Sequence, residues 1–193
     1  AQAIQLPGVS GMENNMVVFE SLRNDEETMQ AIVENMSLAK AGDFDICLYA
    51  STVKPVQFAN GIHVWIRSTD VDNANEMILL SYILSAHPNW EKSKIKIFHI
   101  SKGEDNDIAK EELMKIVEEG RLPISHKNIE TVSISEGLTQ RELIESRSHD
   151  AGIAIIGFRE EQVKHDGKSV FLGYEKMGDI LFVNSRYEKT IID

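Results

Sequence analysis

The sequence predicts an α/β fold in which helices cover both faces of an open, mainly parallel sheet, giving three layers, α/β/α. The prediction starts from residues 61–101. Ile62–Ile66 is a short apolar run rich in β-branched and aromatic residues, which is typical of a strand buried on both faces. Residues 73–87 repeat apolar side chains at helical spacing, and Ile95–Ile100 is a second apolar run. Because a helix separates the two strands, they are predicted to be parallel and joined by a right-handed crossover.

The predicted helix over 73–87 has a start signal, an apolar face and a stop signal. Asn73 and Glu76 have the spacing of a capping box, and Pro88 marks the end of the helix. The side expected to face the sheet carries Met77, Leu80, Ile83, Leu84 and His87, widened by Ile78 and Leu79.

The first 60 residues are predicted to form a loop, then a strand, a helix and a second strand. Met16–Glu20 is the first strand and Phe44–Ala50 the second. Between them, Asn24 and Glu27 have capping-box spacing, and apolar residues repeat at helical spacing until Gly42. Turn residues over 51–60 indicate an internal boundary, so we divide the chain into residues 1–60 and 61–193.

From residue 61 to 193 the pattern predicts a five-stranded domain with alternating helices. Thr139 and Glu142 form a third capping-box pattern, which opens a short helix to about Ser148. Residues 159–178 are expected to be a loop with a short helix. The predicted strands are 62–67, 94–100, 129–134, 151–158 and 179–184, with another helix over 106–119.

Composition favours a globular domain and excludes some classes of partner. The chain has 193 residues, of which 42% are hydrophobic and 26% charged, and its net charge is −11. No lysine–arginine cluster is present, so we expect no nucleic-acid partner and no direct lipid binding. No apolar run approaches the roughly 18 residues of a membrane span. The single cysteine, Cys47, lies in an apolar strand and is expected to be a small buried hydrophobic residue in a reducing compartment.

Motifs that carry chemistry are largely missing. The crossover loop after the 62–67 strand contains Asp70 and Asp72 but no glycine, which disfavours a phosphate cradle. Gly167-Lys168-Ser169 looks like the end of a phosphate loop, but Gln162 stands where the spacing demands glycine, so a surface turn is expected.

Catalytic and metal-ligating patterns are missing as well. Gly157 is followed by Phe158, without the serine of a nucleophile elbow. The six histidines never fall at metal-ligand spacing, and His63 and His99 are expected to be partly buried strand residues. Trp65 and Trp90 are expected to pack in the core. We therefore predict no catalytic, cofactor-binding or metal-binding residues, and no enzyme activity.

Several apolar segments together resemble a known family. IHVWIR (62–67), MILLSYILSAHPNWEKSKIKIFHI (77–100), AGIAIIGF (151–158) and DILFVNS (179–185) resemble the second half of the cytosolic C-terminal domain of the cation–chloride cotransporters. The likeness is to the sodium–potassium–chloride type, within the amino acid–polyamine–cation superfamily. MENNMVVFE and GDFDICLYAS resemble the end of the preceding half-domain. Residues 1–60 would then be a remnant of that half.

The resemblance implies a function without an active site, because its motifs are packing residues. It implies a non-catalytic cytosolic regulatory and dimerisation domain of a secondary transporter that couples chloride with sodium, potassium or both. Such a domain would lie at the cytoplasmic side of the cell membrane, joined to the membrane-spanning domain of the same polypeptide. We expect a homodimer and no cofactor. The opening strands are expected at a sheet edge or paired with another copy.

The same domain family is similar in fold to the universal stress proteins, some of which bind ATP. Their nucleotide signature places G-x-x-G after the fourth strand, followed by a further glycine and a hydroxyl residue. Here Glu160 stands in place of the second glycine, and Gly173 is followed by the bulky Tyr174. An acid and a bulky side chain at phosphate positions disfavour nucleotide binding. The alternative function is a stand-alone module of this kind that binds a nucleotide or another small ligand.

Overall fold

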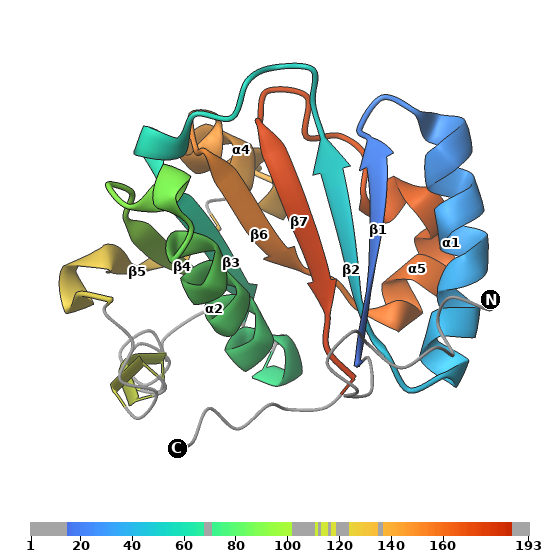
Figure 1. The fold of residues 1–193 in the computed structure, drawn as a ribbon, viewed down its shortest axis with the longest axis horizontal. Helices are drawn as coiled ribbons and strands as arrows, with labels where there is room; N and C mark the ends of the chain where they lie inside the picture. The colour runs from blue at the N-terminus through green and yellow to red at the C-terminus, as the bar shows by residue number, and fades with distance from the viewer. Residues whose placement is uncertain are drawn as a thin grey trace.

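The computed structural model contains a single seven-stranded sheet with helices on both faces (Figure 1). It describes residues 15–67, 71–101, 111, 113–115, 117–118, 124–134 and 137–186. The strands are β1 (Met16–Leu22), β2 (Asp45–Ser51), β3 (Ile62–Arg67), β4 (Ile95–Ser101), β5 (Ile129–Ser133), β6 (Ile153–Gly157) and β7 (Asp179–Asn184). They lie in the order β1-β2-β7-β6-β3-β4-β5. β2 and β7 are antiparallel, and the other paired neighbours among these strands are parallel.

The helices lie on opposite faces of this sheet. The described helices include α1 (Glu26–Ala41), α2 (Val71–Ser85), α4 (Gln140–Ser148) and α5 (Glu160–Asp166). Short 3-10 turns lie in the connecting segments: η2 (Phe58–Asn60), η3 (Pro88–Trp90), η4 (His126–Asn128) and η5 (Gly167–Val170). In Figure 1, α2 crosses the front of the sheet, whereas α1, α4 and α5 lie behind it. This arrangement confirms the predicted three-layer α/β fold.

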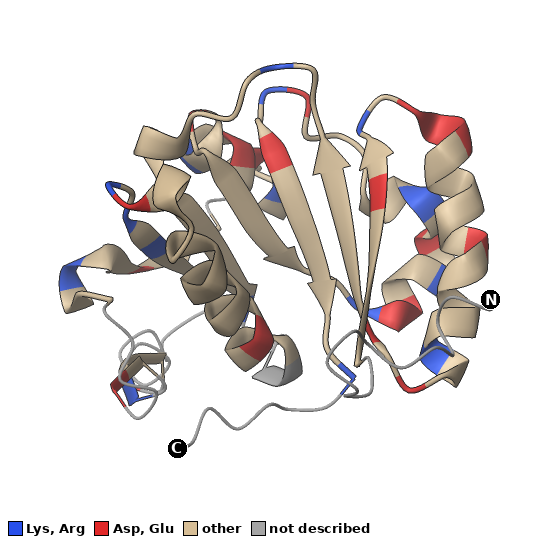
Figure 2. Ribbon diagram, in the orientation of Figure 1, with Lys and Arg blue, Asp and Glu red and all other residues tan. Residues whose placement is uncertain are grey.

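Buried apolar side chains form two groups, one on each face of the sheet. One group joins α1, α4 and α5 to the sheet, and the other joins α2 to the opposite face. β3 supplies both: Trp65 packs in the first group, whereas Val64 and Ile66 pack in the second. Figure 2 shows that charged residues are sparse on the strands and concentrate on helices and loops. The predicted continuous apolar runs are therefore strands covered on both faces.

Sequence-based boundaries agree closely with the structure for the strands. Residues 159–178 form a loop with a short helix, as predicted. Of the predicted helix 106–119, the described residues 111, 113–115, 117 and 118 are helical, and the remainder lies outside the described residues. The division between 1–60 and 61–193 stays a prediction. In the structure, β2 hydrogen-bonds to β7, so the strands on the two sides of this division share one sheet.

Each end of the β2–β7 pair is held by a buried aspartate. Asp179 begins β7 and lies beside the end of β2, where it accepts hydrogen bonds from the Tyr49 hydroxyl and from the Thr52 backbone N–H at 2.8 Å. Asp45 begins β2 and accepts the Arg186 backbone N–H, just beyond β7, at 2.8 Å. Since the strands are antiparallel, the first residue of each fastens the end of the other. Burial and the hydrogen bond to Asp179 raise the pKa of Tyr49.

Two predicted capping boxes are wrong. α1 is capped by Asp25, not by Asn24: Asp25 Oδ1 accepts the Thr28 backbone N–H at 2.9 Å. Asparagine and aspartate are equally good caps, so the capping-box spacing of Asn24 and Glu27 predicts an N-cap one residue before the observed one. α2 begins at Val71, before Asn73. Asn73 is instead a buried contact residue, because its amide donates to the Phe158 carbonyl at 3.1 Å and its Oδ1 accepts the Ser185 N–H at 2.7 Å.

The third capping box is confirmed. The Thr139 hydroxyl oxygen accepts the Glu142 N–H at 3.2 Å, and Glu142 Oε2 accepts the Thr139 N–H at 2.8 Å. At its other end, α4 packs on β3 through Ser148. Ser148 Oγ lies 2.9 Å from Trp65 Nε1, which donates to it, and 2.8 Å from His63 Nδ1. His63 is 2% exposed, and burial lowers its pKa to about 4.

His63 is expected to make stability fall as pH falls. The pKa of this imidazole is about 6.5 in an unfolded chain and about 4 here. The unfolded chain therefore binds more protons between these values, so the contribution is present above pH 6.5 and is lost as pH falls toward 4. The loss is about 3 kcal/mol.

Urea unfolding of wild type and His63→Gln between pH 7 and pH 4.5 measures this contribution. The variant should lose less stability on acidification than the wild type. His149→Gln, at an exposed histidine, is the matched control and should follow the wild-type pH profile. Identical pH profiles for His63→Gln and wild type would contradict the assignment.

Candidate functional site

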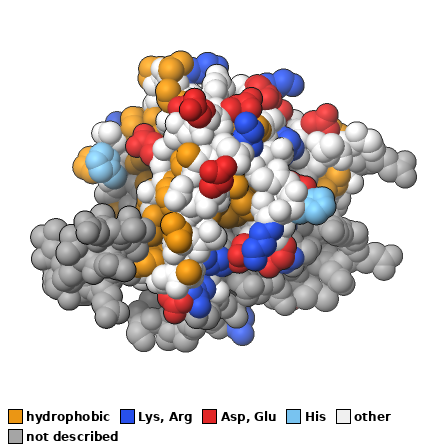
Figure 3. Space-filling view, turned by 90° about the vertical axis from the view of Figure 1, so that its right-hand side faces the viewer, with side chains coloured by type: hydrophobic (Ala, Val, Ile, Leu, Met, Phe, Trp, Pro, Cys, Tyr) orange, Lys and Arg blue, Asp and Glu red, His pale blue; other side chains and the backbone are white. Residues whose placement is uncertain are grey.

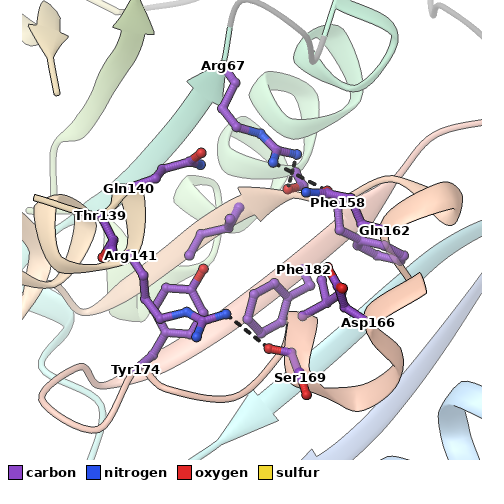
Figure 4. A pocket seen from close by; sticks show the side chains of 13 residues that line it. Arg67, Thr139, Gln140, Arg141, Phe158, Gln162, Asp166, Ser169, Tyr174 and Phe182 are labelled. Carbon is purple, nitrogen blue, oxygen red and sulfur yellow. Dashed lines mark hydrogen bonds between the residues drawn. The ribbon is translucent and has the colours of Figure 1, made fainter. Parts of the chain in front are cut away.

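A cavity of about 480 Å³ lies at the carboxyl ends of β3 and β6 (Figure 4). From β3 the chain continues to β4 and β5 on one side, whereas β6 and β7 lie on the other side. The order of strands therefore reverses between β3 and β6. Ligands of open α/β sheets bind in the crevice at such a point, outside the carboxyl ends of the strands. The fold thus makes this cavity the first candidate for a binding site.

The floor of the cavity is apolar. Ile156 of β6 and Phe182 of β7 line it, together with Phe158 and Val170 from the segments that follow β6. Phe182 is fixed by an edge-to-face contact with Phe171, at 5.1 Å between ring centroids. Ile156, Phe158 and Phe182 belong to the buried group that joins α1, α4 and α5 to the sheet, and Val170 packs against it, so the floor is part of the core.

Arg67, the last residue of β3, forms one side of the cavity. Its Nη2 donates to the Gly157 carbonyl at 2.9 Å, and its Nη1 lies 3.3 Å from Gln162 Oε1. Gly157 ends β6 and Gln162 lies in α5. The guanidinium therefore bridges the carboxyl ends of the two strands across the point where the strand order reverses.

Arg141, in the first turn of α4, forms the opposite side. Its Nη2 donates to the Ser169 carbonyl at 3.0 Å, and its guanidinium carbon lies 5.2 Å from the centroid of the Tyr174 ring. Gly173 has φ +83°, and a Cβ there would lie 2.7 Å from Arg141 Nη1. The positive φ favours glycine at this position, and a larger residue would also displace the end of the Arg141 side chain. Burial raises the pKa of the Tyr174 hydroxyl, and the charge of Arg141 opposes this shift.

Polar groups complete the rim. The hydroxyl residues Thr139 and Ser169 and the amides Gln140 and Gln162 line the cavity with the two arginines. Asp166 is the acidic residue among the described lining residues. Its Oδ1 lies 2.5 Å from His165 Nδ1, and this contact raises the pKa of the histidine. The rim therefore carries two positive charges against one negative charge.

The segments singled out in the sequence have mixed outcomes. Gly167-Lys168-Ser169 forms the turn η5, where Lys168 Nζ pairs with Glu26 at 2.8 Å and Ser169 reaches the cavity. Tyr174 lines the cavity as a bulky group, as expected. Glu160 does not line it, because its carboxylate pairs with Lys40 and, at 2.8 Å, with Lys164. These two lysines lower the pKa of Glu160. Asp70 lies outside the described residues.

Other predicted features can be located within the described part of the chain. Cys47 is buried, and burial raises its pKa to about 12, so it packs as a small apolar side chain. Trp65, Trp90 and His99 are buried. Among the described residues, no group of three His, Cys, Asp or Glu side chains is placed to hold a metal ion. No described helix has the length and hydropathy to cross a membrane.

Sequence reasoning missed Arg67 and Arg141. Each had a positional signal: Arg67 follows a buried strand directly, and Arg141 lies two residues after the Thr139 cap. Nothing in the linear sequence placed them at one cavity, because they lie on separate elements that meet only through the order of strands in the sheet.

A second hollow lies on the face of β1, β2 and β7 beside α2. It has a volume of about 550 Å³. Its wall is mainly apolar and includes Val18 of β1, Tyr49 of β2, Leu181 of β7, and Leu80 and Leu84 of α2. In Figure 1 this part of the sheet has no described helix in front of it. We call it the β1–α2 groove.

Comparison with known proteins identifies the fold. No family model matches the chain. The structure is similar to the crystal structure of the cytoplasmic domain of a prokaryotic cation chloride cotransporter, with a TM-score of 0.61 at 15% sequence identity. The match covers 98% of this chain and 71% of that chain.

A universal stress protein from Archaeoglobus fulgidus is also similar, with a TM-score of 0.56 at 10% identity. This match covers 90% of the present chain, which spans 62% of the length of that protein. Identities this low establish a shared fold. The chain therefore has a universal-stress-protein-like α/β fold, as the resemblance implied, and its architecture is also found in a transporter cytoplasmic domain.

Proposed function

We propose that this chain is a non-catalytic regulatory domain of a secondary ion transporter that couples chloride with sodium, potassium or both. The supporting observation is the extent of the structural match to the transporter cytoplasmic domain, which takes in 98% of the chain. The match must include most of the β1–α1–β2 unit as well as the sheet from β3 onward. Residues 62–67, 77–100 and 179–185, which carry the sequence resemblance, form β3, α2 with β4, and β7.

A domain of this kind acts through its surfaces. It would lie on the cytoplasmic side of the membrane, attached to the membrane-spanning portion of the same polypeptide. The continuous sheet and its two packed faces make it a rigid body. Regulation requires two arrangements of such a body relative to the membrane portion, each favoured by different contacts.

The genomic reading frame around this chain tests the attachment. We expect the frame to extend upstream of Ala1 and to encode hydrophobic segments of about 20 residues, long enough to span a bilayer. The frame can be read by sequencing the locus. An open reading frame that begins near Ala1 and encodes no such segments would overturn the proposal.

We further propose that the chain forms a homodimer through β1 and the β1–α2 groove. β1 is an edge of the described sheet, and edge strands present unpaired backbone groups to other chains. Val18 and Leu22 on this strand are 61% and 51% exposed, respectively. On α2, Leu80 and Leu84 line the groove. Figure 3 shows hydrophobic side chains interspersed with charged ones on the side of the molecule that carries α1 and β1.

Val18→Lys is expected to shift the chain from dimer to monomer, because it places a charge in the apolar contact. Light scattering on the purified chain at high micromolar concentration measures this shift. The control is Val53→Lys, at a loop valine that is 90% exposed, and this variant should remain dimeric. A wild-type chain that stays monomeric at this concentration would contradict the dimer.

The second candidate is a stand-alone module that binds a nucleotide or another small ligand. One observation favours this candidate and weakens the sequence-based argument against it. Glu160, which was expected to repel phosphates, pairs with Lys40 and Lys164 and does not line the cavity. The cavity instead presents Arg67 and Arg141. Against it stands the segment after β6, which lacks the glycines that let backbone N–H groups surround a phosphate chain.

Thermal unfolding with ATP separates the two candidates. A nucleotide-binding module at about a hundred times its Kd would gain about 2.7 kcal/mol of stability, which raises the Tm visibly. We expect no ATP-dependent rise in Tm. A saturable rise would favour the second candidate over a domain that acts only through protein contacts.

A further inference from the structure

We infer that the cavity at the carboxyl ends of β3 and β6 binds a small organic oxyanion, that is, a carboxylate or phosphate ester carried on an apolar body. This inference rests on the second candidate function, because it names the class of ligand for the same cavity, and it does not depend on attachment to a membrane portion. The inference rests on the charge, the fixed geometry and the two-sided chemistry of the cavity wall.

The local charge is opposite to that of the whole chain. The protein has a net charge of −11, yet the charged residues among those described at the cavity are Arg67 and Arg141 against Asp166. Asp166 is already engaged with His165, so its negative charge is partly offset at the rim. A guanidinium presents a planar fork of N–H donors that matches the two oxygens of a carboxylate or phosphate. Because the protein as a whole repels anions, an anion would bind here through its contacts with the two arginines.

Arg141 is held in place before any ligand arrives. The Tyr174 ring lies under its guanidinium, the Ser169 carbonyl accepts from Nη2, and Gly173 allows the backbone to approach Nη1. A side chain fixed in this way loses little conformational entropy on binding, so more of the contact energy appears as affinity. Figure 4 shows Arg141 beside Tyr174 and Ser169, on the opposite side of the cavity from Arg67.

The rest of the wall fits an apolar body of modest size. Ile156, Phe182 and Val170 form the floor, and Thr139 and Gln140 offer hydrogen bonds at the rim. The volume of about 480 Å³ is in the range of small-molecule sites, which are mostly apolar with a few convergent polar groups. The oxyanion would pair with Arg141, and the apolar body would lie against Phe182.

Calorimetric titration of the purified chain tests the inference with phenyl phosphate and benzoate as the two oxyanion probes. Benzamide, which is neutral and close to benzoate in shape, is the ligand control. Saturable binding of either anion with no binding of benzamide supports the inference, and the stronger anion identifies the oxyanion. If neither anion binds, or if benzamide binds as well as benzoate, the inference is wrong.

Variants locate the site. Arg141→Gln should weaken binding of the better probe about tenfold or more, because a charge-assisted pair is lost. Arg147→Gln, on the same helix but paired with Glu130 at 3.6 Å outside the cavity, should leave the Kd unchanged. Equal Kd values for Arg141→Gln and wild type would overturn the assignment, as would an equal loss in both arginine variants.

A pair of charge changes keeps the test valid if Arg141→Gln fails to fold. Gln140→Glu adds a negative charge at the start of α4 and should weaken anion binding. Asp166→Asn removes a negative charge from the exposed rim and should strengthen it. Opposite shifts of the Kd support the inference, and two unchanged Kd values contradict it.

Discussion

The antiparallel pairing of β2 with β7 is the constraint on which the rest of this structure depends. It joins the β1–α1–β2 unit to the parallel strands, and its register sets which side chains of β7 face α2 and which face α4 and α5. A slip of one residue would exchange the two faces. The buried carboxylates of Asp45 and Asp179 fix that register, because each binds groups just beyond or at the end of the opposite strand.

The cavity depends on the same register. Phe182 and Val183 are neighbours on β7, but Phe182 lines the cavity whereas Val183 packs in the group that contains α2. The segment before β7 carries Gly173 and Tyr174, which position Arg141. At the start of β7, Arg23 donates to the carbonyls of Met177 and Gly178, so the β1–α1–β2 unit also secures this segment. The candidate site is thus assembled by contacts from both parts of the chain.

Local signals explain what could be predicted from sequence. The strands 62–67 and 179–184 were recognisable because strands buried on both faces need continuous apolar runs. The Thr139–Glu142 capping box was recognisable because both partners lie within one turn. Asn73 has the same local pattern, but distant contacts to Phe158 and Ser185 decide its role. The β2–β7 register and the placement of Arg67 and Arg141 at one cavity also depend on long-range contacts, so no short stretch of sequence contains them.

The carbonyl of Phe158 gives the fold an unusual mechanical connection. It accepts the side-chain amides of both Asn73, in α2, and Asn184, at the end of β7, at 3.1 and 3.0 Å. The ring of the same residue lines the cavity on the other side of the sheet. The front helix, the last strand and the cavity wall therefore share one residue, Phe158. A displacement of α2 along its axis would therefore act directly on the residue whose ring lines the cavity, through the hydrogen bond from Asn73.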